Sequence, residues 1–239
     1  MAVKKPETQP HVMIVTPAYS GTVHCPYAIS LAETYALLTS HGIKVSFQIE
    51  PNGSLLVASR NRLTERFWQS DATHMLCIDS DLGWPAQAVL AMLQTGKEFV
   101  AGVYPSRKEK GFIFRPCYKD QNTQELITEN HLIKMEAVPA GFMLVARSAI
   151  KKMRQHFPEL YYSPKDPRDD SESTYALFNT ELIGGQFWGE DYVFCLRAKQ
   201  AGIDIWADPL IQFDHAGTVG MLAEILTKKE DKNVGIKSS

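Results

Sequence analysis

The sequence predicts an α/β protein in which a mostly parallel sheet is flanked by helices within a single domain. Two observations predict this class. Over the first hundred residues, short apolar runs typical of strands alternate with longer segments that have helical spacing of apolar positions. In addition, no internal repeat and no linker divides the 239 residues. We expect a disordered segment at 1–10, the folded domain at 11–220 and a C-terminal helix or polar tail at 221–239.

The first half of the chain contains strand and helix signals in strict alternation. They predict a strand at 11–15 stopped by Thr16-Pro17, a helix at 25–41, a strand at 43–49, a helix at 55–70, a strand at 75–78, a helix at 86–94 and a strand at 99–103. A β-α-β opening of this kind predicts parallel strands joined by a right-handed crossover.

The second half is less regular. Residues 104–135 are polar with short strand-like pieces, and 158–175 form a long loop rich in Pro, Asp and Ser, a composition typical of lids and substrate contacts. The regular elements predicted here are a buried strand at 138–145, helices at 148–156 and 189–201, and strands at 203–206 and 210–213.

Composition excludes several classes of protein. The net charge is −2, so a general field that attracts polyanions is not expected, and a nucleic-acid acceptor would need a local patch. The four cysteines form no CxxC pair, and Cys77 and Cys195 are predicted to be buried small hydrophobes. The start MAVKKPETQP has no apolar segment, and no run reaches the ~18 apolar residues of a membrane span. We expect a soluble cytoplasmic protein.

Two carboxylates stand directly after a strand. Asp79-Ser80-Asp81 follows the apolar run 75–78, where carboxylates are costly unless solvent, an arginine or a metal ion neutralises them. In open α/β sheets, ligands bind beyond the carboxyl ends of strands, and an Asp-x-Asp there can hold Mg²⁺ or Mn²⁺. A solvated turn that caps the next helix is the alternative. The strand before the pair and the helix after it favour a ligand site.

Two further groups of residues, near the ends of predicted strands and helices, could bind a metal ion or transfer a proton. His215 follows the last strand and could complete a carboxylate-rich Mn²⁺ site, although a lone loop histidine is more often a surface residue. Glu190 and Asp191 start the helix at 189–201, where acids stabilise the free N–H groups. One of these acids could instead remove the proton from an acceptor hydroxyl. Gly184-Gly185 upstream permits close approach of the backbone to a ligand.

The diphosphate and nucleotide candidates lie nearer the N-terminus. Arg60, within Ser59-Arg60-Asn61, could pair with a diphosphate, and an ion pair with Glu65 is an equally good interpretation. The chain has no GxGxxG and no GxxxxGK[ST], which disfavours NAD binding and P-loop chemistry. The segment 16–19 (TPAY) could instead seat a base and ribose.

In order and approximate spacing, these elements resemble a GT-A fold glycosyltransferase of the family 2-like group, of the small soluble viral or bacterial type. The resemblance covers about residues 11–217 and is carried by IVTPAY, SRN, IDSDLGWP, PAGFMLVARSAI, FWGEDYVFCLRAKQAG and DHAG. It implies a Rossmann-like mixed sheet. It also implies a nucleotide-diphospho-sugar donor, UDP- or GDP-linked, bound with Mn²⁺ or Mg²⁺, from which one sugar moves to an acceptor hydroxyl of a glycan or another compound.

The resemblance also assigns roles to residues of this chain. The implied nucleotide and donor contacts are Thr16, Pro17, Tyr19, Arg60, Asp79, Ser80 and Asp81. The implied metal ligands are Asp79, Asp81 and His215. Asp191, with Glu190 beside it, is the implied catalytic base of an inverting reaction, and the implied acceptor or sugar pocket contains Gly141, Trp188 and Gly189.

The chain also departs from the larger members of the group. It lacks a QxxRW element, which argues against a processive membrane synthase and for transfer of one sugar at a time. If transfer is retaining, the acids at 190–191 would orient the acceptor and no such base is required. A non-catalytic nucleotide-sugar-binding module is the first alternative function. A nucleotidyltransferase ranks lower, because residues 16–24 lack its glycine-rich basic loop.

Overall fold

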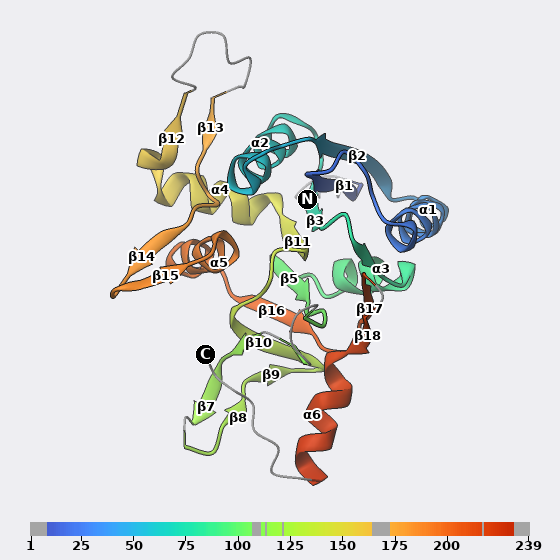
Figure 1. Ribbon diagram of the computed structural model, residues 1–239, viewed down its shortest axis with the longest axis vertical. Helices are drawn as coiled ribbons and strands as arrows, with labels where there is room; N and C mark the ends of the chain where they lie inside the picture. The colour runs from blue at the N-terminus through green and yellow to red at the C-terminus, as the bar shows by residue number, and fades with distance from the viewer. Residues whose placement is uncertain are drawn as a thin grey trace, which may run out of the picture.

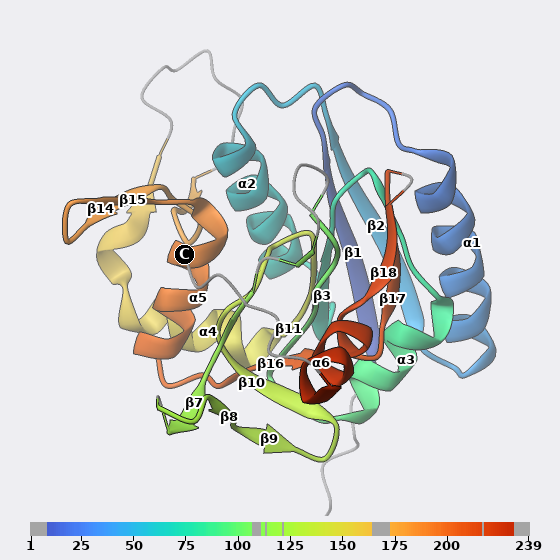
Figure 2. The ribbon, with the colours of Figure 1, turned by 60° about the horizontal axis from the view of Figure 1, so that its bottom comes forward.

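A nine-stranded sheet forms the centre of the molecule, and helices cover both of its faces (Figures 1 and 2). The computed structural model describes residues 9–106, 111–112, 114–120, 122–163, 173–216 and 218–231. The strand order is β2-β1-β3-β11-β5-β16-β10-β6, with β9 paired to β10. The strands of this sheet are β1 (His11–Ala18), β2 (Lys44–Pro51), β3 (His74–Ile78), β5 (Phe99–Gly102), β6 (Arg115–Pro116), β9 (Thr128–Glu129), β10 (Leu132–Ala137), β11 (Phe142–Ala146) and β16 (Ile205–Asp208).

The sheet is mixed, with most strands running in one direction. β1 is parallel to β2 and β3, and β5 is parallel to β16. β11 runs antiparallel to its neighbours β3 and β5, and β10 runs antiparallel to β16 and β6. The predicted fold class is confirmed: a mixed, mostly parallel sheet with flanking helices in a single α/β domain.

The helices divide between the two faces of the sheet. α2, α4 and α5 contribute to one apolar core, and α1 and α3 contribute to the other. The helix predictions are confirmed to within one or two residues at each end, because regular apolar spacing marks each buried face. The helices are α1 (Cys25–Ser40), α2 (Leu56–Gln69), α3 (Ala86–Gln94), α4 (Arg147–His156), α5 (Glu190–Gln200) and α6 (Leu222–Asp231).

The first strand continues through the proline that was expected to stop it. β1 pairs with β2 as far as Ala18, whereas its pairing with β3 ends at Val15. The backbone groups of alternate residues point to alternate neighbours, so the missing N–H of Pro17 is on the side where β3 has already ended. Pro17 therefore costs no ladder hydrogen bond, and the prediction of a strand limited to 11–15 was wrong.

The predicted strand at 138–145 is a turn followed by a strand. β10 ends at Ala137 and β11 begins at Phe142. Between them, the amide of Gly141 donates to the hydroxyl of Tyr104 (3.1 Å). Residues 138–141 are apolar and lie in the interior. An apolar run indicates burial, and burial alone does not distinguish a strand from a buried turn.

Shorter elements surround the sheet. β4 (Leu82–Gly83), β17 (Gln212–His215) and β18 (Thr218–Met221) form a three-stranded sheet. Two-stranded pairs are β7 (Tyr118–Asp120) with β8 (Glu125–Leu126), β12 (Tyr161–Tyr162) with β13 (Thr174–Tyr175), and β14 (Glu181–Ile183) with β15 (Gln186–Trp188).

Parts of the predicted terminal segments and of the loop at 158–175 lie outside the described residues, namely 1–8, 164–172 and 232–239. Among the helices that the structure describes, none has the length and apolar character to cross a membrane.

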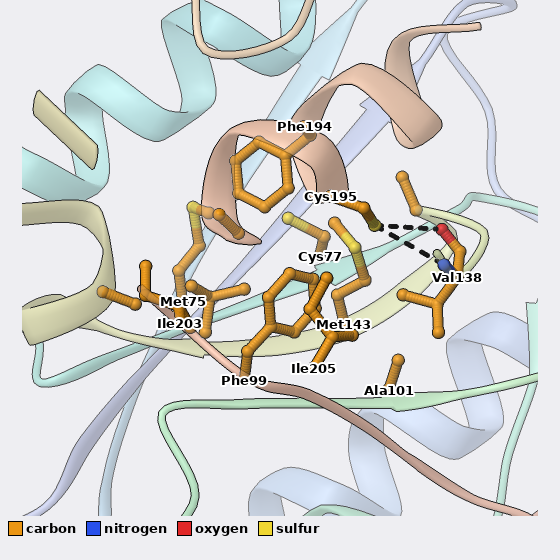
Figure 3. Packing of buried hydrophobic residues seen from close by; sticks show 14 of the residues in the cluster. Met75, Cys77, Phe99, Ala101, Val138, Met143, Phe194, Cys195, Ile203 and Ile205 are labelled. Carbon is orange, nitrogen blue, oxygen red and sulfur yellow. Dashed lines mark hydrogen bonds between the residues drawn. The ribbon is translucent and has the colours of Figure 1, made fainter. Parts of the chain in front are cut away.

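The core beside α5 is built from tightly packed aromatic and sulfur-containing side chains (Figure 3). Phe194 stacks on Phe178 with ring centroids 4.2 Å apart and meets Phe99 edge-on at 5.9 Å. Cys77 and Cys195 are buried as predicted, and burial raises the pKa of each thiol to about 12. These thiols are packing groups, and the rigid core fixes α5 against the sheet.

Candidate functional site

The polar candidates gather where strands of the central sheet end. Asp79 directly follows β3, and its amide donates to the carbonyl of Gly141 (3.0 Å) at the start of β11. Arg60 projects from α2, and Glu190 is the first residue of α5. Parallel strands bring their carboxyl ends to one edge, so residues far apart in the chain meet there. We refer to Arg60, Asp79, Tyr104 and Glu190 as the arginine cluster.

Arg60 is the centre of this cluster. Its side chain is only 4% exposed and donates to Asp79 Oδ1 (2.8 Å) and to the carbonyl of Ala140 (3.2 Å). Its Nε lies 3.5 Å from Glu190 Oε1. Burial disfavours the charged guanidinium, but Asp79 and Glu190 outweigh that effect and raise the pKa of Arg60. Arginine is thus the partner of Asp79, and Glu65 pairs with Arg154 instead (2.6 Å).

Glu190 carries a perturbed carboxyl group. Burial raises its pKa, and Asp191 adds to this effect while Arg60 opposes it. A desolvated acid near a second acid is an arrangement found at many functional sites. Asp191 is partly buried, and its Oδ1 accepts the backbone N–H of Tyr192 (2.7 Å). The cap position of α5 is occupied by Gly189, so both acids lie in the first turn.

Replacing Glu190 with Gln is expected to give a protein whose stability relative to the wild-type protein increases as the pH rises. Because the folded-state pKa is raised, the stability contributed by the protonated acid is present below the unfolded-state pKa and is lost as the pH rises through the folded-state pKa. The neutral Gln escapes this loss. Thermal unfolding of both proteins between about pH 4 and pH 8 measures the difference. A variant that is less stable at every pH would mean that the ion pair with Arg60 outweighs burial.

Tyr104 was missed by the sequence analysis. It lies two residues beyond β5, is half-buried, and its hydroxyl is 3.5 Å from Asp79 Oδ2. Burial and the Asp79 carboxylate raise the pKa of Tyr104 well above its ordinary value, so the hydroxyl stays protonated and donates. The signal was present, because a strand was predicted at 99–103 and the carboxyl ends of parallel strands meet at one edge of a sheet.

Asp81 and His215 form a second group beside the arginine cluster. His215 Nε2 lies 3.7 Å from Asp81 Oδ2, and the His215 ring meets Tyr104 edge-on at 4.9 Å. The pairing of β17 with β4 brings them together, and the amide of Ala216 donates to the carbonyl of Asp81 (3.2 Å). His215 Nδ1 is 2.6 Å from the carbonyl oxygen of Pro105, to which it donates. Because Nδ1 is engaged with Pro105, Nε2 is the ring nitrogen that faces Asp81.

Two of the three predicted metal ligands, Asp81 and His215, lie together. A carboxylate and an imidazole whose other nitrogen is held by a backbone carbonyl fit the chemistry of a divalent-cation site. Asp79 differs, because its carboxylate contacts Arg60 and Tyr104. Within the described ranges, no group of three or more His, Cys, Asp or Glu residues is placed to hold a metal ion.

The predicted nucleotide contacts lie in different environments. The Thr16 side chain is fully buried, and its hydroxyl bonds to that of Tyr27 (2.6 Å). Pro17 is buried in β1, whereas Tyr19 is 75% exposed. The carbonyl of Ser80 accepts the amide of His24 (2.9 Å). Among these, Tyr19 presents its side chain at the surface.

An acid at the end of β2 was also missed. Glu50 is buried opposite Pro17 in the β1–β2 register. Its carboxylate pairs with Arg62 and Arg66, both at 2.6 Å. Its position gave a signal, since Glu50 directly follows the strand predicted at 43–49, beside the carboxyl end of β1. The two arginines place positive charge beside this end of the sheet.

The predicted acceptor pocket contains an aromatic stack. Trp188 and Tyr192 stack with ring centroids 3.9 Å apart, and the Arg115 guanidinium lies 4.5 Å from the Trp188 centroid. The stack flanks Glu190 and Asp191 in the chain, so its rings adjoin the first turn of α5. Of the other predicted members, Gly189 is the cap residue of α5, and Gly141 lies beside Asp79 and Tyr104.

Replacing Gly141 with Ala is expected to disturb the arginine cluster. A Cβ would overlap the Tyr104 hydroxyl and lie 2.5 Å from Asp79 Oδ2, closer than van der Waals contact allows, so both side chains must move. Such overpacking costs about 1–3 kcal/mol. Urea unfolding of Gly141→Ala, with and without Tyr104→Phe, measures the effect. The double variant should lose less stability than the sum of the two single variants, and full additivity would contradict this interpretation.

Comparison with known proteins yields solved structures but no family. No family model and no curated protein matches the chain. A glycosyltransferase involved in the glycosylation of the major capsid of PBCV-1 is similar over 67% of this chain and 72% of that chain, with 10% identity and a TM-score of 0.36. TarS of S. aureus is similar over 82% of this chain, with 12% identity and a TM-score of 0.40. The chain spans 35% of the length of TarS. Neither likeness establishes a family or an activity for this chain.

Proposed function

We propose that this protein is a glycosyltransferase that moves one sugar from a nucleotide-diphospho-sugar to an acceptor hydroxyl. The observation that carries the proposal is the joining of two groups at one edge of the sheet: the Asp81–His215 pair and the arginine cluster, with Tyr104 in contact with both. Such an edge is where α/β sheets bind ligands. The groups present suit a charged donor and a nucleophilic hydroxyl.

Asp81 and His215 are the proposed ligands of Mn²⁺ or Mg²⁺. Their oxygen and nitrogen donors lie 3.7 Å apart, and the bond from His215 to Pro105 sets the tautomer that can bind a cation. When bound, the cation would supply positive charge to the diphosphate leaving group. We assign Asp79 to the ribose rather than to the cation, because Arg60 already fixes its orientation.

Asp191 is the proposed base. It lies in the first turn of α5, and its partly buried carboxylate needs only to accept the proton of the attacking hydroxyl. Glu190 is held near Arg60, which suits a role in orienting the acceptor. A base that faces the acceptor gives inversion at the anomeric carbon, because the hydroxyl attacks from the side opposite the leaving diphosphate. Trp188 beside these acids is the proposed wall of the acceptor pocket.

The decisive experiment measures nucleoside diphosphate released from UDP-, GDP- and dTDP-sugars, each with Mn²⁺, Mg²⁺ or EDTA. We expect slow, cation-dependent hydrolysis of one donor by the wild-type protein and none by Asp81→Ala. The anomeric configuration of a transferred sugar, read by NMR, tests inversion. Donor-dependent thermal stabilisation without release, also in the presence of a panel of acceptors, would assign a binding module instead. If no donor is hydrolysed and no donor stabilises the protein, the proposal is refuted.

A further inference from the structure

The outer edge of β2 is open. β2 lies at one end of the nine-stranded sheet (Figure 1), and it pairs with β1 over all eight of its residues. In the part of the chain that the structure describes, no strand pairs with its other side. An open strand edge of this length is a template for pairing with another chain. Which strand can pair with this edge depends on the backbone groups of β2 that face outward.

The hydrogen bonds at the two ends of β2 show which of its backbone groups face outward. The amide of Lys44 donates to the carbonyl of Pro10, and the amide of Asn52 donates to the carbonyl of Ala18, both at 3.0 Å. In a parallel pair, alternate residues of a strand bond to the same neighbour. The even-numbered residues of β2 therefore face β1, and the N–H and C=O groups of the odd-numbered residues face the open edge. These residues are Val45, Phe47 and Ile49, and Pro51 ends the row because it has no N–H.

We propose that this edge pairs with β2 of a second copy of the chain, antiparallel and with the two-fold axis at Phe47. In this register Phe47 faces itself, and Val45 faces Ile49 of the second copy. All three outward N–H groups of each copy then meet an outward carbonyl of the other. A register moved by two residues would set an outward residue against Pro51, which has no N–H, or against Ile43, which precedes the strand.

The side chains along the edge fit the same arrangement. Val45, Phe47 and Ile49 share the face that α1 covers, because alternate residues point to one face. Phe47 is 39% and Ile49 is 41% exposed, and Phe47 lies 5.7 Å from the exposed Tyr35 of α1. Apolar cross-strand pairs of this kind stabilise antiparallel strands. A second copy would cover these side chains with identical ones.

Helix α1 extends this apolar surface. Glu33 is the single charged residue among its 16 residues, and the helix also exposes Ile29. A helix that faces water normally carries charged residues on its outer side. Antiparallel pairing of β2 would place the two candidate sites at opposite edges of the joined sheet. Neither site would be covered by the second copy.

The first test uses a charge pair at the two-fold axis. Sedimentation of the full chain over a range of concentrations should give a species of twice the chain mass. Phe47→Lys and Phe47→Glu each set like charges against each other, so each should be monomeric. Their equimolar mixture sets Lys against Glu and should restore the dimer. Leu182→Lys is the matched control, since Leu182 is 77% exposed on the distant β14–β15 pair, and it should remain dimeric.

The second test needs no variant. Hydrogen exchange of the wild-type protein should slow at the amides of Val45, Phe47 and Ile49 as concentration rises, while Ser46 and Gln48 stay protected throughout. A wild-type protein that is monomeric at every concentration would overturn the proposal and leave the edge to a different partner. A dimer that persists in both Phe47 variants, or a mixture that does not associate, would also overturn it.

Discussion

Asp191→Asn is expected to lower the rate of sugar transfer by about 10²–10⁴-fold while donor binding stays near that of the wild-type protein. Asn has nearly the shape of Asp but cannot take up the hydroxyl proton. Asp191 is partly buried at the start of α5, and its Oδ1 accepts the amide of Tyr192, a contact that the Asn side-chain oxygen can retain. The fold should therefore persist. Steady-state transfer kinetics and donor titration by calorimetry measure the two quantities separately.

Two variants make this prediction specific to Asp191. Asp204→Asn changes an exposed acid that pairs with Lys134 and should leave transfer unchanged. Glu190→Gln should impair acceptor binding more than the rate at saturating acceptor, because Glu190 is proposed to orient the acceptor. If Glu190→Gln abolishes turnover and Asp191→Asn does not, the base is Glu190 and the assignment of the two acids is reversed.

The two carboxylates of Asp79-Ser80-Asp81 are expected to respond to substitution in opposite ways. Asp81→Ala should abolish cation-dependent donor hydrolysis and change stability little, because Asp81 and His215 are proposed to serve the cation. Asp79→Ala should instead destabilise the fold by about 3 kcal/mol, because it removes the closest partner of a buried guanidinium. Urea unfolding and the change in Tm on addition of MnCl₂ with donor measure both effects.

The contrast between these variants can be checked at Arg60. Removing the guanidinium together with the carboxylate, as Arg60→Met with Asp79→Ala, should recover part of the stability lost in Asp79→Ala, since no buried charge is left without its main partner. A comparable loss of stability in Asp81→Ala and Asp79→Ala would show that Asp81 is also structural. Cation-dependent stabilisation that survives in Asp81→Ala would remove Asp81 from the metal site.

Local pattern in the sequence determined most of the regular structure. The spacing of apolar residues predicted α1, α2 and α3 almost to the residue, because each helix buries one stripe against the sheet. The apolar run before Asp79 predicted β3, and Arg60 and Tyr104 lie close to Asp79 at the end of this strand. The same local reasoning failed at 138–145, because the apolar run there includes both a buried turn and a strand. It also failed at Pro17, because a proline is tolerated in β1 only where the neighbouring β3 has already ended.

Only the tertiary structure decided which of these groups are partners. The sequence offered Arg60 a diphosphate or Glu65 as its partner. The fold instead pairs Arg60 with Asp79, 19 residues away, and Glu65 with Arg154. Tyr104 and Pro105 enter the site because β5 and β3, on either side of β11, end at the same edge of the sheet. The chain beyond β5 then reaches His215 of β17, a proximity that no local pattern encodes. The tautomer of His215 likewise depends on a carbonyl 110 residues distant. Spacing along the chain determines which faces are buried, whereas pairing across the sheet determines which charges meet.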